Sequence, residues 1–240
     1  MLNDTPRIDV IEAARVTVLP DFHPEAGPTF AGFPVNAFVI HHPDGPIIVD
    51  TGIDTGIGTD NDHINRWYCP ETRNMRDELG RCGIDPDAPL AIVNTHLHFD
   101  HCGQNHAFPL ATIYAQQAEI DLIGRDPFYT VAEWAAMPVG RSTIIDGDHH
   151  LADGIELLHT PGHSPGHQSV VIRSRHDTIV IAGQCLWTAT DWTTSNVRAT
   201  NLHDAPSATE AADSIARLKA LRPTRVHLSH DHHVIVDDPT

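Results

Sequence analysis

A cluster of histidines directly after a short apolar run is the feature that most constrains this chain. Residues 90–93 (LAIV) are typical of a buried strand, because apolar residues follow one another without alternation. The stretch from His96 to His101 (HLHFDH) then places three imidazoles and one carboxylate within a few residues. If the backbone stays extended, His96 and His98 point the same way, since side chains alternate along a strand. Imidazole and carboxylate ligands suit a divalent ion such as zinc, so the sequence predicts a metal site at a strand end.

Composition and charge limit the classes of partner. The 240 residues carry a formal net charge of −17, which disfavours a nucleic acid as partner. No apolar segment is long enough to span a membrane, and the first residues lack the apolar stretch of a secretory signal. No linker-like segment divides the chain. We therefore expect a cytoplasmic protein with a single domain over residues 1–240 and no membrane partner.

Three further motifs repeat the pattern of a polar residue just past a predicted strand. Asp50 follows residues 46–49, His163 and His167 lie in TPGHSPGH after residues 155–159, and His230 follows residues 225–228. Two Pro-Gly pairs make the TPGHSPGH segment a turn-rich loop, which presents His163 from a rigid backbone.

Together these motifs resemble the metallo-β-lactamase-fold hydrolases, whose signature is HxHxDH after a strand. Within that family the likeness is greatest to the N-acyl-homoserine lactonases, and it covers nearly the whole chain. The resemblance implies the α/β (α+β) class, as a four-layer αββα sandwich of two mixed sheets with outer helices. It also implies a zinc-dependent hydrolase of the quorum-quenching type, which opens the ring of N-acyl-homoserine lactones or similar lactones through a metal-activated hydroxide.

The resemblance also assigns roles to individual residues. One zinc ion would be bound by His96, His98 and His163, and a second by Asp100, His101 and His230. Asp100 would in addition pass a proton to the departing alkoxide, while Asp50 and His167 would hold the ligands in place.

Two positions depart from the family pattern. Gln184 falls where the family has an aspartate that bridges the two ions, and a neutral amide cannot neutralise two cations. Two alternatives stay open: a second site weakened by this amide, or a thiolate ligand supplied by Cys185. Trp187 stands where the lactonases carry a tyrosine whose hydroxyl contacts the substrate carbonyl, so we expect Trp187 to line the substrate pocket.

Other aromatic residues and histidines have less defined expectations. Trp67 and Tyr68, in a predicted loop over residues 54–70, either form a wall of the substrate pocket or plug the core beneath the loop. The aromatic residues of segment 125–141 either line the mouth of a pocket or pack onto the core. Four paired histidines beside turn residues are expected to be ordinary surface groups: His41, His42, His149 and His150.

The motifs specify the fold more narrowly than the substrate. A hydrolase of another ester, thioester or amide is the alternative that keeps the metal chemistry, and a degenerate metal-binding scaffold is the alternative without catalysis. In each catalytic case the partner is a small molecule, and the chain is expected to be a monomer or a homodimer.

Overall fold

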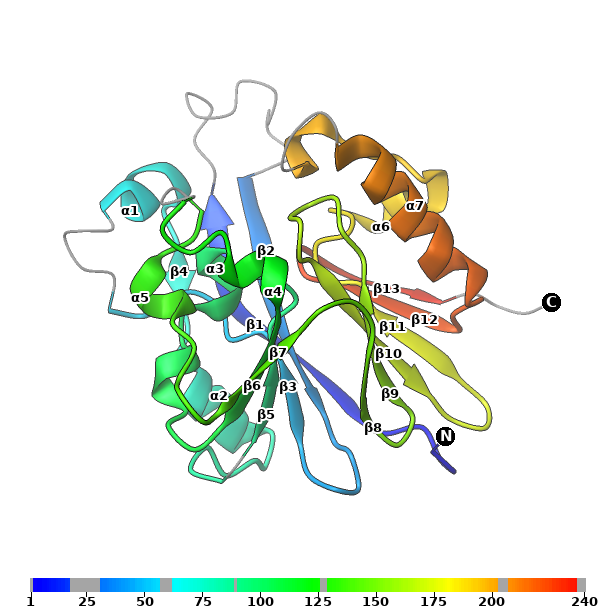
Figure 1. The fold of residues 1–240 in the computed structure, drawn as a ribbon, viewed down its shortest axis with the longest axis horizontal. Coiled ribbons are helices and arrows are strands. Elements are labelled where there is room, and N and C mark those ends of the chain that lie inside the picture. The colour runs from blue at the N-terminus through cyan, green and yellow to red at the C-terminus, as the bar shows by residue number, and fades with distance from the viewer. Residues whose placement is uncertain are drawn as a thin grey trace.

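Two mixed sheets form the centre of the structure, a computed structural model that describes residues 2–17, 31–56, 62–88, 90–125, 129–202 and 207–236. The first sheet has the order β4-β1-β2-β3-β5-β6-β7 and the second β13-β12-β11-β10-β9-β8 (Figure 1). The strands of the first sheet are β1 (Ile8–Thr17), β2 (Ala31–Ile40), β3 (Ile47–Val49), β4 (Glu71–Thr72), β5 (Ala91–Val93), β6 (Thr112–Gln116) and β7 (Ser142–Ile145). Those of the second are β8 (His149–Ala152), β9 (Ile155–His159), β10 (Gln168–Arg173), β11 (Thr178–Ile181), β12 (Arg225–Leu228) and β13 (Asp231–Val236).

Strand direction decides which loops meet. Strands β3, β5, β6 and β7 pair in parallel, with Val49 opposite Val93. In the second sheet, β11 and β12 are parallel and the other neighbours are antiparallel. Because parallel strands end at the same edge, the segments that follow β3 and β5 lie side by side. Asp50 at this edge donates its backbone N–H to the carbonyl of Val93, at 2.9 Å.

The continuous apolar runs of the sequence are explained by burial on both faces of each sheet. In β2, Phe38 belongs to the core between the two sheets, whereas Val39 belongs to the core on the outer face of the first sheet. In β10, Val170 and Ile172 face the other sheet, while Val171 faces outward. One apolar layer therefore joins the two sheets, and each sheet also packs against outer elements.

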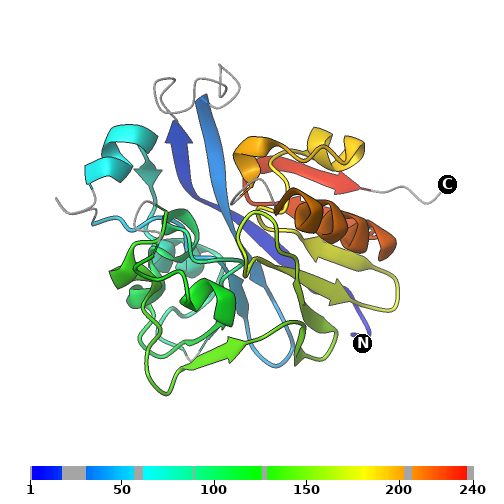
Figure 2. The same cartoon turned by 45° about the horizontal axis from the view of Figure 1, so that its top comes forward.

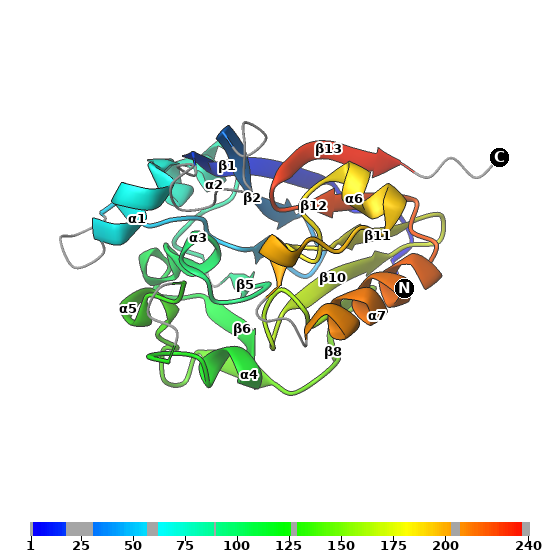
Figure 3. The ribbon, with the colours of Figure 1, turned by 90° about the horizontal axis from the view of Figure 1, so that it is seen from above.

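Helices cover the two outer faces and complete the expected αββα arrangement. Helix α2 packs on the first sheet through Met75 and Leu79, and α7 packs on the second through Ile215 and Leu218. Seen from above, α1 to α5 lie beside the first sheet and α6 and α7 beside the second (Figure 3). The view turned by 45° shows the same division, with the cyan and green helices on one side and the yellow and orange ones on the other (Figure 2). Their bounds are α1 (Asp62–Tyr68), α2 (Met75–Arg81), α3 (Phe99–Cys102), α4 (Gln117–Ile120), α5 (Ala132–Ala135), α6 (Ala189–Thr194) and α7 (Ser207–Ala220), with short 3-10 turns at Asn105–Ala107 and Ala199–Asn201. The four-layer fold class predicted from the sequence is confirmed.

Several local predictions were wrong. The predicted loop 54–70 contains helix α1, and the next helix, α2, begins at Met75. That start is fixed by the side chain of Asn74, which accepts hydrogen bonds from the backbone N–H groups of Arg76 and Asp77. His42 is buried rather than a surface residue, and its Nε2 lies 2.9 Å from the carbonyl oxygen of Asp153.

Within the described part of the chain, no helix is both long and apolar enough to cross a bilayer.

Gly103, the residue after α3, provides a test of how the histidine-rich segment is anchored. Its N–H donates to the carbonyl of Gly52 at 2.8 Å, and an added Cβ would lie 2.7 Å from that oxygen and also against the backbone N of Asp54. We expect Gly103→Ala to lower the free energy of unfolding by about 1–3 kcal/mol through this overpacking. Urea denaturation of the purified variant measures the change.

The matched control is Gly80→Ala in the exposed part of α2, where an added Cβ meets nothing within 4 Å. This substitution is expected to raise stability by about 0.5–1 kcal/mol through helix propensity. Equal effects of the two substitutions would show that the close approach at Gly103 carries no strain.

Candidate metal centre

The candidate ligands all follow strands, as the sequence predicts. His96 and His98 come directly after β5, with His98 as the residue that precedes α3. His163 lies in the loop between β9 and β10, and His230 lies between β12 and β13. The structure brings the six residues into two groups, His96, His98 and His163 in one and Asp100, His101 and His230 in the other. Within each group the candidate ligand atoms lie within 4.8 Å of one another.

The first group consists of three imidazoles that face one another. Nε2 of His163 lies 3.1 Å from Nε2 of His96 and 3.1 Å from Nδ1 of His98. Nδ1 of His163 is 3.1 Å from the carbonyl oxygen of Asn201, which can only accept, so the proton of a neutral His163 is on Nδ1. Its Nε2 therefore presents a lone pair to the other two rings. Burial lowers the pKa of both His96 and His163 well below the usual value, which favours neutral, metal-binding imidazoles.

The second group combines a carboxylate with two imidazoles. Oδ2 of Asp100 lies 3.4 Å from Nε2 of His101 and 3.6 Å from Nε2 of His230. Nδ1 of His230 donates to the carbonyl oxygen of Pro34 at 2.9 Å, so its Nε2 carries the lone pair. That Nε2 is buried and has no hydrogen-bond partner among the described residues. Burial lowers the pKa of His230 to about 4.

Asp50 supports this arrangement from behind the ligands. Its Oδ2 accepts from Nδ1 of His101 and from the hydroxyl of Thr95, each at 2.8 Å, and its Oδ1 accepts from the N–H of Thr95 at 2.7 Å. Although burial opposes protonation of His101, the carboxylates of Asp100 and Asp50 prevail and raise its pKa to about 10. These hydrogen bonds tie Asp50 to His101 and Thr95; that Asp50 supports a metal ligand stays a prediction.

The residues of both groups fit divalent cations. Ring nitrogens of His96 and His98 face Nε2 of His163, and a buried nitrogen of His230 has no hydrogen-bond partner among the described residues. Nitrogen-rich sets with a carboxylate are typical of zinc. That these residues bind metal stays a prediction.

Gln184 and Cys185 face different surroundings. Oε1 of Gln184 lies 3.2 Å from Nε2 of His101, at the edge of the second group. Cys185 instead packs in the apolar cluster beneath α6 and α7, and burial raises the pKa of its thiol to about 12. The geometry therefore favours Gln184 over Cys185 beside the ligands.

His167 is buried, and its Nε2 accepts the N–H of Gln184 at 3.1 Å, which fixes the backbone of this loop.

Aromatic side chains pack against one histidine of each group. The ring of Trp187 lies 4.6 Å from that of His230, centroid to centroid, and Phe33 contacts both rings edge-on at 5.0 Å. Tyr129 belongs to segment 125–141, which was expected either to line a pocket mouth or to pack onto the core. Its ring stacks on His98 at 5.1 Å and also packs against a core cluster. These contacts place Trp187 and Tyr129 against candidate ligands. Residues 126–128 of that segment lie outside the described part of the chain.

Trp67 and Tyr68 belong to the core beside the histidine segment. Tyr68 is buried in a cluster with Phe99, whose ring lies 4.8 Å away, and Trp67 packs against the same cluster. This packing agrees with the alternative in which the two aromatics plug the core. A contact with substrate stays a prediction.

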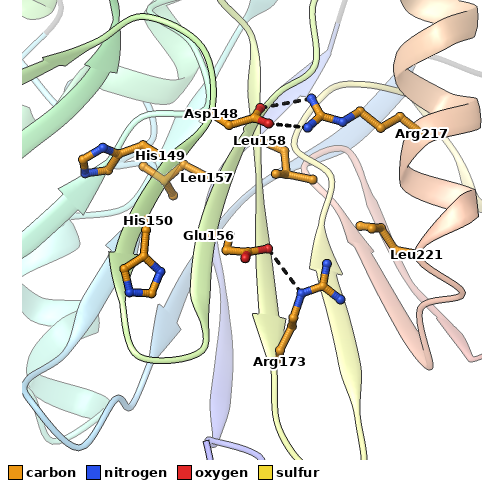
Figure 4. Close-up of a pocket in the computed structure, with 9 residues that line it drawn as sticks. All are labelled: Asp148, His149, His150, Glu156, Leu157, Leu158, Arg173, Arg217 and Leu221. Atoms are coloured by element: carbon orange, nitrogen blue, oxygen red, sulfur yellow. Dashed lines mark hydrogen bonds and ion pairs between the residues drawn. The ribbon is translucent and has the colours of Figure 1, made fainter. Parts of the chain in front are cut away.

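A separate hollow lies on the outer face of the second sheet, between β8, β9, β10 and α7 (Figure 4). It has a volume of about 350 Å³, and none of its lining residues belongs to the two ligand groups. Arg217 pairs with Asp148, and Arg173 pairs with Glu156 at 3.2 Å. Because both arginines are neutralised within the hollow, it offers no unpaired cation among its lining residues. His149 and His150 lie at its side, as half-buried and exposed groups respectively.

The sequence alone did not identify several contacts of the site. Asn201 orients His163 through a backbone carbonyl, and Phe33 contacts His230 from the other end of the chain. Neither residue follows a motif, so the sequence carries no signal for them. Thr95 could have been found, because it directly precedes the histidine segment.

Comparison with known proteins agrees with the geometry. The family model described as the metallo-beta-lactamase superfamily matches residues 31–230. An N-acyl homoserine lactonase from a Bacillus species is 34% identical over 149 residues, which is 59% of this chain and 59% of the relative. The lactonase AttM of Rhizobium radiobacter is 28% identical over 159 residues, or 58% of this chain and 60% of the relative. The match thus spans about three fifths of the length of these curated relatives.

Solved structures extend the likeness to nearly the whole fold. An N-acyl homoserine lactone hydrolase, with the product N-hexanoyl-L-homoserine at its catalytic metal centre, superposes with a TM-score of 0.79 at 27% identity. The alignment covers 97% of this chain and 95% of that one. AidC, a dizinc quorum-quenching lactonase, shares the fold at 16% identity, with a TM-score of 0.70 over 98% of this chain and 93% of its own. From the extent of the family match and the agreement of the fold, the chain belongs to the metallo-β-lactamase superfamily, and within it is similar to the N-acyl homoserine lactonases.

Proposed function

We propose that this protein is a zinc-dependent hydrolase that opens the ring of N-acyl-homoserine lactones or similar small lactones. The observation that carries the proposal is the meeting of two ligand groups at one end of the two sheets, in a fold that superposes on a lactone hydrolase over 97% of the chain. In that hydrolase the product N-hexanoyl-L-homoserine lies at the catalytic metal centre.

His96, His98 and His163 would hold one ion, and Asp100, His101 and His230 the second. When bound, the ions supply Lewis-acid polarisation of the lactone carbonyl and a water molecule of lowered pKa. Asp100 faces both His101 and His230, so its carboxylate is placed to accept a proton from water and return it to the leaving alkoxide. Burial opposes ionisation of Asp100, but the histidines beside it, chiefly His101, outweigh burial and hold the pKa of this carboxyl below its usual value.

Apolar rings complete the proposed pocket. Trp187 and Phe33 pack beside His230, and Tyr129 packs beside His98, so the walls near both ligand groups are aromatic. Such walls exclude water and suit the acyl part of a lactone. Trp187 lacks the hydroxyl of the family's tyrosine and would contribute shape, or one N–H donor, to substrate binding.

The remaining expectations are consistent with this function. The apolar layer shared by both sheets supports a single domain over residues 1–240. A cytoplasmic location and a monomeric or homodimeric state stay predictions, as does the small-molecule nature of the partner.

The first experiment measures ring opening by proton release, with a panel of acyl-homoserine lactones, simple γ- and δ-lactones and a thioester. Metal content is determined on the same preparation. We expect turnover of lactones by zinc-loaded protein and its loss after chelation. A filled site with thioester turnover and no lactone turnover would contradict the proposed substrate.

A ligand substitution tests the assignment of the first group. Substitution of a residue that only hydrogen-bonds to a metal ligand typically lowers metal affinity or activity by about 10–100-fold. His163→Ala removes a candidate ligand itself, so it is expected to lower turnover by more than about 100-fold. The control is His150→Ala, an exposed histidine outside both groups, which should retain activity. Retained turnover in folded His163→Ala protein would show that the first group is assigned wrongly.

Gln184 provides a separate test of the second ion. A carboxylate at this position would add a negative charge beside His101, so Gln184→Asp is expected to tighten binding of the second ion by about tenfold or more. Competition with a chromophoric chelator measures both affinities. Asn65→Asp, an exposed change of the same charge in α1, serves as control. Unchanged affinities in Gln184→Asp would mean that this side chain does not face the second ion.

A further inference from the structure

Glu119 is a buried acidic residue outside both ligand groups. It lies in the short helix α4 and is 1% exposed. Its Oε2 accepts the backbone N–H of Leu97 at 2.9 Å, and its Oε1 accepts the backbone N–H of Gly166 at 2.8 Å. Leu97 stands between His96 and His98, while Gly166 belongs to the loop that carries His163. One carboxylate therefore joins the two segments that supply the first group.

The neighbouring contacts converge on the same place. Gln168 donates its N–H to the carbonyl of Thr95 and its Nε2 to the carbonyl of Asn94, each at 2.8 Å. Its Oε1 accepts from Nε2 of Gln116, which directly precedes α4, at 2.9 Å. These amides close the gap between the end of β5 and the start of β10. Glu119 is the ionisable member of this set.

Gly166 shows how closely the helix approaches the loop. A Cβ at this position would lie 2.7 Å from both Cγ and the backbone N of Glu119, and 3.0 Å from Cβ of Gln116. The loop of His163 is thus pressed against α4 at the point where the carboxylate accepts its N–H. This approach is a second observation, independent of the hydrogen bonds, that the spacing between α4 and the loop is fixed.

We propose that Glu119 is a positioning residue, which sets the distance between His96 and His98 on one loop and His163 on the other. It acts through the backbone of the two loops. The proposal rests on the proposed metal binding of the first group, and it does not depend on the identity of the substrate. Both carboxylate oxygens are required, because each is an acceptor for a different N–H group.

An amide or a shorter acid cannot replace this carboxylate. In Glu119→Gln one oxygen is exchanged for an NH₂ group, which turns a donor towards a backbone donor. Glu119→Asp keeps the charge and both oxygens but is one methylene shorter, so it cannot reach both loops. Both substitutions are therefore expected to loosen the first group, whereas an exposed Glu133→Gln in α5 should have no effect.

The test is zinc affinity, measured by competition with a chromophoric chelator, together with the visible absorption spectrum of the cobalt(II)-loaded protein. We expect Glu119→Gln and Glu119→Asp each to lower the affinity of the first group for its ion by about 10–100-fold and to alter the cobalt spectrum. A residue that only stabilised the fold would lower the urea midpoint of the metal-free protein without changing either readout.

The outcomes separate the two proposals. Wild-type affinity and spectrum in both variants would overturn the role of Glu119. Wild-type values in Glu119→Asp alone would show that the charge of the side chain matters and its length does not, which would also overturn this role. Failure of the wild-type protein to bind zinc would instead overturn the proposed function. If the variants do not fold, hydrogen exchange of the wild-type protein decides. The amides of Leu97 and Gly166 should both be strongly protected, and fast exchange of either would contradict the proposal.

Discussion

The carboxylate of Asp50 is the contact on which the arrangement of the site depends. Asp50 directly follows β3. Its carboxylate accepts three hydrogen bonds from the segment after β5, two from Thr95 and one from His101. To reach them, Asp50 adopts a left-handed backbone with φ of 62°, which a residue with a side chain rarely does. Such a conformation costs free energy, and it persists because the hydrogen bonds of the buried carboxylate define it.

The candidate ligands near this contact include few negatively charged side chains. The two candidate ligand groups contain five imidazoles and a single carboxylate, that of Asp100. Gln184 adds an oxygen without charge. The other carboxylates near the loops, Asp50 and Glu119, act one step away, through His101 and through backbone N–H groups. Two of the three carboxylates near the site therefore lie behind the candidate ligands and not between the proposed ions. At that short distance their negative charge still favours the binding of cations.

The sequence predicted the fold class and family correctly, because four motifs that resemble the family each follow an apolar run, and such runs mark strands buried on both faces. The grouping of His96 and His98 with His163 came from the same resemblance. Helix α1 in the predicted loop 54–70 was missed, since a seven-residue helix is too short for a sustained sequence period and forms by packing Ile64 and Tyr68 into the core. Glu119 could not have been identified, because its role depends on two N–H groups from distant parts of the chain that only the folded backbone brings together.

The late position of His230 has a consequence for how the chain is made. This residue follows β12, which pairs in parallel with β11 and is joined to it by a long segment that includes α6 and α7. During synthesis from the N-terminus, all residues of the first group are present once residue 163 has been added, whereas the second group also needs residue 230. A domain folds as a unit, so the second group forms only when both sheets have folded. Docking of β12 against β11 brings His230 to this group, and the arrival of a second ion would report that β12 has joined its sheet.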